Sequence, residues 1–258
     1  MRDLSIKTPL YALAAVIAVP IAILFYSAGP IGVLSSFEDP QFLSSLGLTM
    51  LGASMATAFN VALGTPAAYA LARGLIRGEG ALYDLLLSPV SIPHTVVGIM
   101  LLIMFSPASP LHDLFGILNP LDTLWGMVLA MFYVSVPIYV MSMREHFERS
   151  DLEMERFLGS LGLPPSSIFY SVILRGSIGS IARISLLSMG RAISEFGSIV
   201  ILAYSVSMAP LFYYVKPATV LIWYKYDVYG LSAAVGYASA LLMVTLILSI
   251  LAYLASGD

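Results

Sequence analysis

The chain has 258 residues, of which 59% are hydrophobic and 10% are charged, and its mean hydropathy is +0.91. A soluble globular domain carries about 25% charged residues, so this composition excludes a soluble domain and predicts an integral membrane protein. The net charge is only −3, and the absence of cysteine excludes disulfides, thiolate metal sites and cysteine nucleophiles.

Apolar runs of about 20 residues are typical of transmembrane helices. The chain contains six such runs, so we predict an all-α, polytopic membrane protein with six transmembrane helices, forming one domain over residues 1–258. The first run has no clear small-residue cleavage pattern, and we expect a retained span rather than a signal peptide. The predicted spans are residues 9–28, 46–72, 81–105, 122–143, 178–204 and 231–254.

The third predicted span contains Pro89 and Pro93, which remove backbone donors and should bend or break the helix. Broken helices at membrane depth usually line cavities. Ser91, His94 and Thr95 are therefore candidate pore-lining residues. The alternative for His94 is a hydrogen-bonded, purely structural role.

A charged segment, residues 144–175, separates the fourth and fifth predicted spans, and we expect it to lie in water. Ser150 and Glu153 have the spacing of a capping box, which predicts a helix start. This helix should end at Gly162, before the prolines at 164 and 165. Its apolar residues recur at helical spacing and share one face, away from the charged side chains: Met154, Phe157, Leu158 and Leu161.

A second short helix should follow and bury Ile168, Phe169, Val172 and Ile173. Two interpretations of the first helix remain open. It is either an amphipathic helix on the bilayer surface or a helix that fits a groove on a partner protein. The acidic residues at its start disfavour contact with anionic lipid.

The fifth predicted span carries a stripe of polar side chains. Intramembrane charges usually face a bundle interior or a water path, so these residues are candidates for lining or gating a pore. The alternative is an ion pair between Arg191 and Glu195 that only holds helices together. The stripe consists of Ser188, Arg191, Ser194, Glu195 and Ser198.

Lysine and arginine concentrate in the N-terminal tail, in the loop after the second predicted span and in the 144–175 segment. By the positive-inside rule, both termini and this segment face the cytoplasm, in a cell (inner or plasma) membrane. The opposite side carries two segments with many aromatic and proline residues, 106–121 and 205–230. They form either an interfacial aromatic belt or a docking rim for an external partner.

The chain has no Gly-x-x-x-x-Gly-Lys-[Ser/Thr] sequence, so we do not expect it to hydrolyse ATP itself. Metalloprotease and serine-hydrolase motifs are also missing. His94, His112 and His146 fall in different segments and predict no metal site. These absences leave a transporter, a channel or a membrane subunit powered by another chain, with no catalytic residue, cofactor or nucleic-acid partner predicted.

Glu155, Gly162, Val172 and Leu174 have a spacing that resembles the cytoplasmic coupling motif of ABC importer permeases. The copy departs from that motif after the acid, where it has arginine and phenylalanine, and at Arg175, where proline is usual. Residues 192–197 (Ala-Ile-Ser-Glu-Phe-Gly) and 92–99 (Ile-Pro-His-Thr-Val-Val-Gly-Ile) resemble the molybdate/tungstate permease branch. The similarity covers nearly the whole chain, and sulfate permeases are similar relatives.

The resemblance implies a homodimer with a pore on its two-fold axis, two copies of a cytoplasmic ABC ATPase that bind ATP and Mg, and an extracytoplasmic oxyanion-binding protein. Closure of the ATPase pair would bring the two coupling helices together and open the pore outward. Glu155 would orient the coupling helix, Gly162 would make the turn, and Phe157 and Leu161 would fill a groove on the ATPase. The expected coupling residues are Glu153, Glu155, Arg156, Phe157, Leu158, Leu161, Gly162 and Leu163.

Three alternatives stay open on the sequence. The first is a sulfate/thiosulfate ABC permease. The second is a self-contained secondary transporter driven by an ion gradient, in which Glu195 is the proton or cation site. The third is a membrane scaffold that transports nothing, for which the polar stripe would have no purpose.

Overall fold

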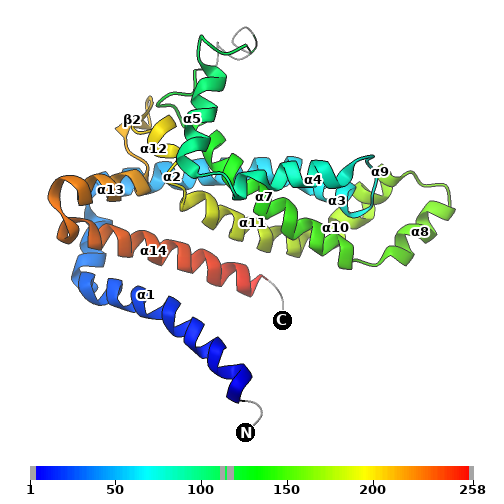
Figure 1. Cartoon of the computed structure of the whole chain (residues 1–258), viewed down its shortest axis with the longest axis horizontal. Helices are drawn as coiled ribbons and strands as arrows, with labels where there is room; N and C mark the ends of the chain where they lie inside the picture. Colours follow the sequence, from blue (N-terminus) through cyan, green and yellow to red (C-terminus); the bar gives the residue numbers. More distant parts are fainter. Residues whose placement is uncertain (1–3, 111–113, 115–118, 256–258) are drawn as a thin grey trace.

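The computed structural model describes residues 4–110, 114 and 119–255, and the chain is almost entirely helical. Long helices lie side by side along the longest axis, α5 stands across this axis, and α1 diverges from the bundle toward the N-terminus (Figure 1). The described elements are α1 (Leu4–Glu38), α2 (Pro40–Phe59), η1 (Asn60–Gly64), α3 (Thr65–Ala72), α4 (Glu79–Leu87), η2 (Ser88–Val90), α5 (His94–Phe105), α7 (Leu124–Arg149), α8 (Leu152–Ser160), α9 (Pro165–Ile168), η3 (Phe169–Ile173), α10 (Leu174–Gly176), α11 (Ile178–Ile193), α12 (Ile199–Leu202), β1 (Val206–Met208), β2 (Phe212–Val215), α13 (Ala218–Tyr229) and α14 (Leu231–Leu254).

Within the described ranges, four helical stretches are long and apolar enough to cross a membrane. Two bent helix pairs raise the total to six if each pair counts as one span. The four stretches are Lys7–Glu38, Pro40–Ala72, Leu124–Arg149 and Leu231–Leu254, and the pairs are Glu79–Val90 with His94–Phe105 and Pro165–Gly176 with Ile178–Ile193. The chain is therefore built as a polytopic membrane protein.

The first two long helices meet near Asp39. α1 breaks at Gly29, where φ is 63°, so the first predicted span ends at this break. Asp39 then caps α2, because its carboxylate accepts a hydrogen bond of 2.9 Å from the backbone N–H of Gln41. The same carboxylate accepts a hydrogen bond of 2.6 Å from the Tyr237 hydroxyl, which joins the start of α2 to α14.

The third predicted span is broken, as its prolines predict. α4 gives way to the 3₁₀ turn η2 at Ser88, and α5 begins at His94, directly after Pro93. The two halves are bent by 110°. Proline supplies no N–H for the helix ladder, so the bend falls where two donors are missing.

The fifth predicted span is not one helix to residue 204. α11 ends at Ile193, five residues without regular helix follow, and α12 begins at Ile199. The physical reason is local: the Glu195 side chain accepts a hydrogen bond from the backbone N–H of Ser198, and this bond replaces a helical one. The bent pair that could cross a membrane here instead joins α9–α10 to α11, with a bend of 75°.

The predicted outer segment 205–230 is more ordered than its proline and aromatic content indicates. It forms an antiparallel hairpin, β1–β2, followed by α13. α13 packs against α14 and α2 and buries Val220 and Leu221, and this burial of apolar side chains stabilises the helix. Part of the other predicted outer segment, including His112, lies outside the described residues.

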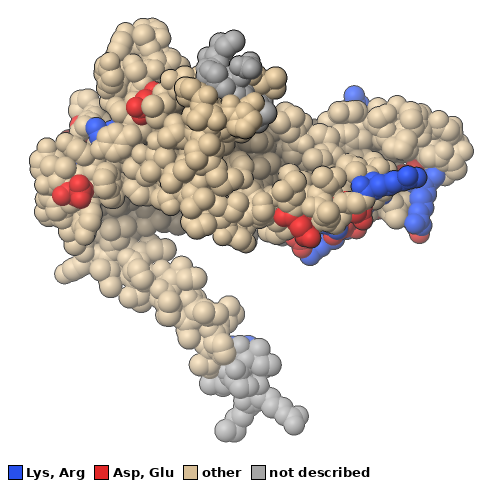
Figure 2. Space-filling view, turned by 45° about the horizontal axis from the view of Figure 1, so that its top comes forward, with Lys and Arg blue, Asp and Glu red and all other residues tan. Residues whose placement is uncertain are grey.

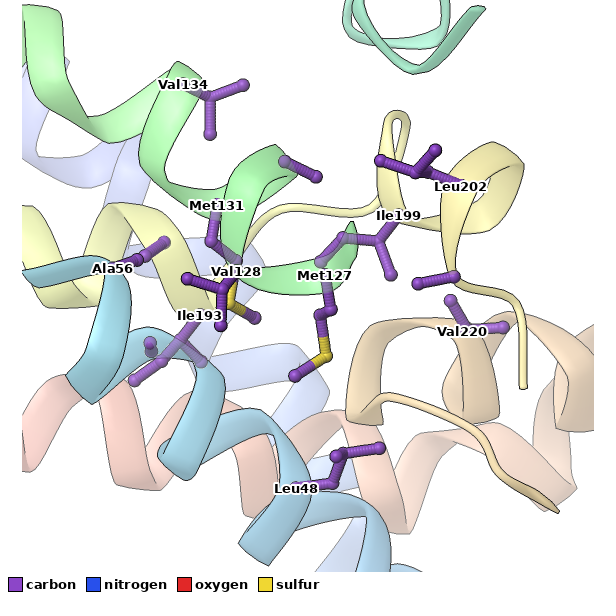
Figure 3. Packing of buried hydrophobic residues seen from close by; sticks show 14 of the residues in the cluster. Leu48, Ala56, Met127, Val128, Met131, Val134, Ile193, Ile199, Leu202 and Val220 are labelled. Atoms are coloured by element: carbon purple, nitrogen blue, oxygen red, sulfur yellow. The ribbon is translucent and has the colours of Figure 1, made fainter. Parts of the chain in front are cut away.

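The main core lies where α2, α7, α11, α12 and α13 meet. Met127 of α7 lies between Leu48 of α2 and Ile199 of α12, with Val220 of α13 nearby (Figure 3). A second core, built around Tyr69, Tyr139 and Phe147, joins α3, α7, α11 and η3. This second core supports the end of the molecule that carries α8.

Candidate functional site

The charged segment after α7 folds into a short helix, α8, but its cap differs from the expected one. The N-cap is Asp151, whose carboxylate accepts a hydrogen bond of 2.8 Å from the backbone N–H of Glu153. Ser150 is instead the C-cap of α7, and its hydroxyl donates to the carbonyl of Phe147 at 2.7 Å. The predicted capping box is therefore wrong by one residue, because the Ser150 hydroxyl is engaged by the preceding helix.

The predicted turn at Gly162 is confirmed. α8 ends at Ser160, Gly162 has a φ of +86°, and α9 begins at Pro165. A left-handed backbone of this kind is strained for any residue with a Cβ atom. Of the four apolar residues expected to be buried next, Ile168 and Phe169 are buried, whereas Val172 and Ile173 are half-buried.

The apolar face of α8 points away from the bundle. Met154, Phe157 and Leu161 are 51%, 62% and 65% exposed, and Leu158 is half-buried. Solvent-exposed apolar side chains gathered on one helix face mark a contact surface. The other residues expected to act in coupling are also exposed: Glu153, Arg156, Gly162 and Leu163.

Glu155 is the exception on α8, because its side chain is only 7% exposed and points into the bundle. Its carboxylate accepts hydrogen bonds from Arg73 Nη2 at 2.5 Å and Arg73 Nε at 3.0 Å. The Tyr69 hydroxyl donates a further bond of 2.8 Å, and Arg73 Nη2 also donates to the Ser150 hydroxyl at 2.6 Å. The bond from Arg73 to Glu155 raises the pKa of the guanidinium, which keeps it charged.

Aromatic packing surrounds this ion pair. The Tyr69 ring lies edge-on to Phe147 at a centroid distance of 5.5 Å and against Phe169 at 4.7 Å. On the neighbouring side of α7, Arg144 lies 4.2 Å above the ring of Tyr83 in α4. The loop after α3, the end of α7 and α8 are thus held together at one end of the molecule.

A second polar cluster lies where α5 meets the end of α11. Oε2 of Glu195 is 3.2 Å from Arg191 Nη2 and 3.1 Å from His94 Nδ1. Arg191 Nη2 is also 3.1 Å from His94 Nε2. His94 and Arg191 are 97 residues apart in the sequence, so the fold brings the two predicted groups of pore candidates together.

The Glu195 carboxylate is buried and fully engaged. Its Oε1 accepts bonds from the Ser198 N–H at 2.9 Å and the Ser198 hydroxyl at 2.8 Å, and the Thr219 hydroxyl binds the Glu195 carbonyl. α5 approaches this break closely, since a Cβ atom on Gly197 would lie 2.6 Å from Cβ of His94. The described residues contain no group of His, Asp and Glu side chains that could hold a metal ion.

The predicted polar stripe therefore divides into two parts. Ser188 is buried and accepts a hydrogen bond of 2.8 Å from Asn60 of η1, which also donates to Ser135 of α7. It does not join the cluster at Glu195, because it faces the helix bundle. The accessible candidates are Ser91, Thr95 and Ser194, which are exposed, and His94 and Arg191, whose side chains are 42% and 24% exposed.

Comparison with known proteins decides the family. The family model described as "Binding-protein-dependent transport system inner membrane component" matches residues 61–256. The chain belongs to this family of ABC importer permeases. The match begins within η1 and includes α8, the Glu195 break and α14, so it covers both candidate sites.

Relatives place the permease more narrowly. It is 35% identical to the molybdate/tungstate transport system permease WtpB of Pyrococcus furiosus over 84% of this chain and 78% of that protein. The WtpB permease of Thermococcus kodakarensis is also 35% identical, over 92% and 88%. A crystal structure of a bacterial alginate ABC transporter, in complex with its alginate-bound periplasmic protein, shares the fold, with a TM-score of 0.65 over 97% of this chain and 94% of that chain at 14% identity. The permease is thus a member of the molybdate/tungstate branch, as the sequence motifs predict.

The sequence did not point to three residues that the permease structure makes prominent. Arg73 is one of the basic residues in the loop after the second predicted span. The sequence indicates no role for it beyond its positive charge, because its partner, Glu155, is 82 residues away. Tyr69, the second ligand of Glu155, carries no local signal. Asn60 does carry one, since an amide in the middle of a predicted span needs a partner inside the bundle.

Proposed function

We propose that this permease subunit forms the translocation pathway for tetrahedral oxyanions, molybdate or tungstate first, in an importer driven by ATP hydrolysis on a separate subunit. The observation that carries the proposal is the arrangement of α8. Its apolar face is exposed, while Glu155 holds the helix to the bundle. The substrate rests on the names of the WtpB relatives.

In this proposal α8 is the coupling helix. Phe157 and Leu161 fill a groove on the ATPase, with Met154 beside them, and a helix-in-groove contact of this kind needs apolar anchors one turn apart. The charged residues Glu153 and Arg156 flank the anchors. Gly162 makes the turn that lets the helix project. Leu158 and Leu163 complete the face.

The charge distribution supports the orientation. On the face shown in Figure 2, charged side chains gather mainly toward the end that carries α8, a few mark the other end, and the surface between is almost uncharged. The four apolar helical stretches and two bent pairs would be six spans, with both termini and α8 in the cytoplasm. The hairpin and α13 would then face outward, where a binding protein delivers the oxyanion.

Two copies of the subunit would enclose the pathway, with the cluster of His94, Arg191 and Glu195 lining or gating it. Arg191 can attract an oxyanion, but Glu195 offsets its charge, and a transport site must release its cargo. When ATP closes the ATPase pair, the two α8 helices approach and the pathway opens outward. The family match favours this externally powered mechanism over a self-contained, ion-driven transporter and over a scaffold.

Reconstitution tests the proposal. The permease would be placed in proteoliposomes with the P-loop ATPase and the secreted binding protein encoded by neighbouring reading frames, and uptake of labelled molybdate, tungstate and sulfate measured. We expect uptake of molybdate or tungstate that requires ATP and the binding protein. Uptake driven by an ion gradient without ATP would contradict the mechanism. Uptake of sulfate in preference to molybdate and tungstate would show that the proposed substrate is wrong.

A further inference from the structure

A buried salt bridge joins α8 to α3, two elements that are far apart in the sequence. Arg73 stands directly after α3, and its guanidinium meets the carboxylate of Glu155 with both Nε and Nη2. The side chains are 9% and 7% exposed. A bidentate contact between a guanidinium and a carboxylate fixes the orientation of the two groups as well as their distance. A contact with a single ammonium group fixes only the distance.

This salt bridge is the main attachment of α8 to the bundle. Within α8, all of which the structure describes, Glu155 is the one buried residue. The helix otherwise packs mainly against α9, the next short helix of the same segment. Tyr69 and Ser150 complete the set of polar partners, and both lie on the α3 and α7 side of the joint.

The element at the other end of the salt bridge reaches deep into the bundle. α3 continues back through the π-turn η1 into α2, within one stretch long enough to cross a membrane. In η1, Asn60 donates hydrogen bonds of 2.8 Å to Ser135 of α7 and Ser188 of α11. π-turns interrupt regular helices and often occur at functional positions. Ser188 lies one turn before Arg191 on α11.

We propose that Arg73 is a positioning residue for coupling, through which a displacement of α8 moves the α2–η1–α3 stretch and not only the helices that flank α8 in the chain. The inference rests on the proposed docking of α8 to an ATPase. Arg73 does not contact the ATPase or the substrate in this proposal. It acts by keeping α8 and α3 in one rigid unit.

The decisive variant removes both charges, because a single substitution would leave one buried charge without a partner and could prevent folding. We would make Arg73→Met together with Glu155→Gln and measure ATPase association, ATP hydrolysis and uptake per ATP hydrolysed. Arg149→Ala is the matched control, since Arg149 is 78% exposed and, among the described residues, its ion-pair partner is Glu145 of its own helix. We expect the double variant to assemble and hydrolyse ATP while uptake per ATP falls about tenfold, and the control to match the wild type.

Cross-linking supplies a second test, because the chain has no cysteine of its own. The double variant Arg73→Cys, Glu155→Cys would be cross-linked with bifunctional methanethiosulfonates of increasing length, and each single variant would serve as control. We expect the unlinked pair to be uncoupled and one linker length to restore uptake per ATP, and reduction to abolish it again. Restoration would show that the mechanical link, not the charge, is what coupling needs.

The outcomes separate this inference from the proposed function. If the wild type neither binds the ATPase nor couples hydrolysis to uptake, the proposed function fails. If the wild type is coupled and the Met/Gln double variant keeps the wild-type ratio of uptake to ATP, the inference about Arg73 is overturned and the proposed function stands. Failure of every linker length to restore coupling would likewise count against a rigid α8–α3 unit.

Discussion

His94 Nδ1 lies 3.1 Å from Oε2 of Glu195, so a residue at the start of α5 contacts a residue just beyond α11. Each belongs to a place where a predicted span is interrupted, one by prolines and one by the Glu195–Ser198 hydrogen bonds. Helix interruptions at membrane depth are stable only inside protein or beside a water-filled cavity. This is the reason why we place the proposed pathway at the contact between His94 and Glu195.

Arg191→Ala should reduce transport more than assembly. The Glu195 carboxylate keeps its two hydrogen bonds from Ser198 and its contact with His94, so the variant leaves this buried side chain hydrogen-bonded. Uptake of labelled oxyanion by the reconstituted importer would be compared with the yield of complex. Ser249→Ala is the control, because the Ser249 hydroxyl is exposed and donates to the Thr245 carbonyl of its own helix, α14. Normal uptake by a normally assembled Arg191→Ala complex would refute a role in the pathway.

Phe157→Ala should weaken ATPase binding while leaving the fold intact. An anchor residue in a groove contributes about 2 kcal/mol or more to binding, whereas a side chain that is 62% exposed contributes little to folding. Binding of the solubilised permease to the ATPase would be titrated, and thermal unfolding recorded. Tyr213→Ala is the matched control, because Tyr213 is an equally exposed aromatic residue in the β1–β2 hairpin. Equal ATPase affinities for the two variants would exclude Phe157 as an anchor.

Gly162→Ala should disturb the turn after α8. A residue with a Cβ atom pays about 1–2 kcal/mol for the left-handed backbone that Gly162 adopts. Gly159→Ala provides the contrast, since Gly159 lies within α8 and an added methyl group there meets no atom within 4 Å. That change should be neutral or stabilise the helix by about 0.5–1 kcal/mol. We expect Gly162→Ala, but not Gly159→Ala, to lower ATP-driven uptake. Equal uptake by the two variants would contradict a specific role for the turn at Gly162.

Asn60→Ala should loosen the bundle. The change removes the donor shared by Ser135 and Ser188, and interhelical hydrogen bonds in membranes contribute about 0.6–2 kcal/mol each. The variant should unfold at a lower temperature in detergent than the wild type. Ser44→Ala is the comparison, because the exposed Ser44 hydroxyl donates only to the Pro40 carbonyl of its own helix. An unchanged melting temperature for Asn60→Ala would show that the hydrogen bonds of the Asn60 amide do not stabilise the helix bundle.

Much of the local structure could be predicted from the sequence because its causes are local. The break between α4 and α5 follows from Pro89 and Pro93, and the end of α8 follows from Gly162. The family motifs were also sufficient to identify an importer permease. The break after Ile193 was missed, since apolar residues on both sides of it predict one continuous helix and the competing bond from Ser198 to Glu195 depends on a side-chain conformation.

By itself, the sequence determined that this is a membrane protein of the importer-permease type, with apolar helices and one charged, helix-forming segment between them. Hydropathy, helical periodicity and turn residues are properties of neighbouring positions, so they can be seen without a fold. Only the tertiary structure decided that Glu155 turns inward to Arg73 and that His94 reaches Glu195. Those pairings join residues that are distant in the chain, and they form because helix packing buries the carboxylates of Glu155 and Glu195, which then need partners to offset the loss of water.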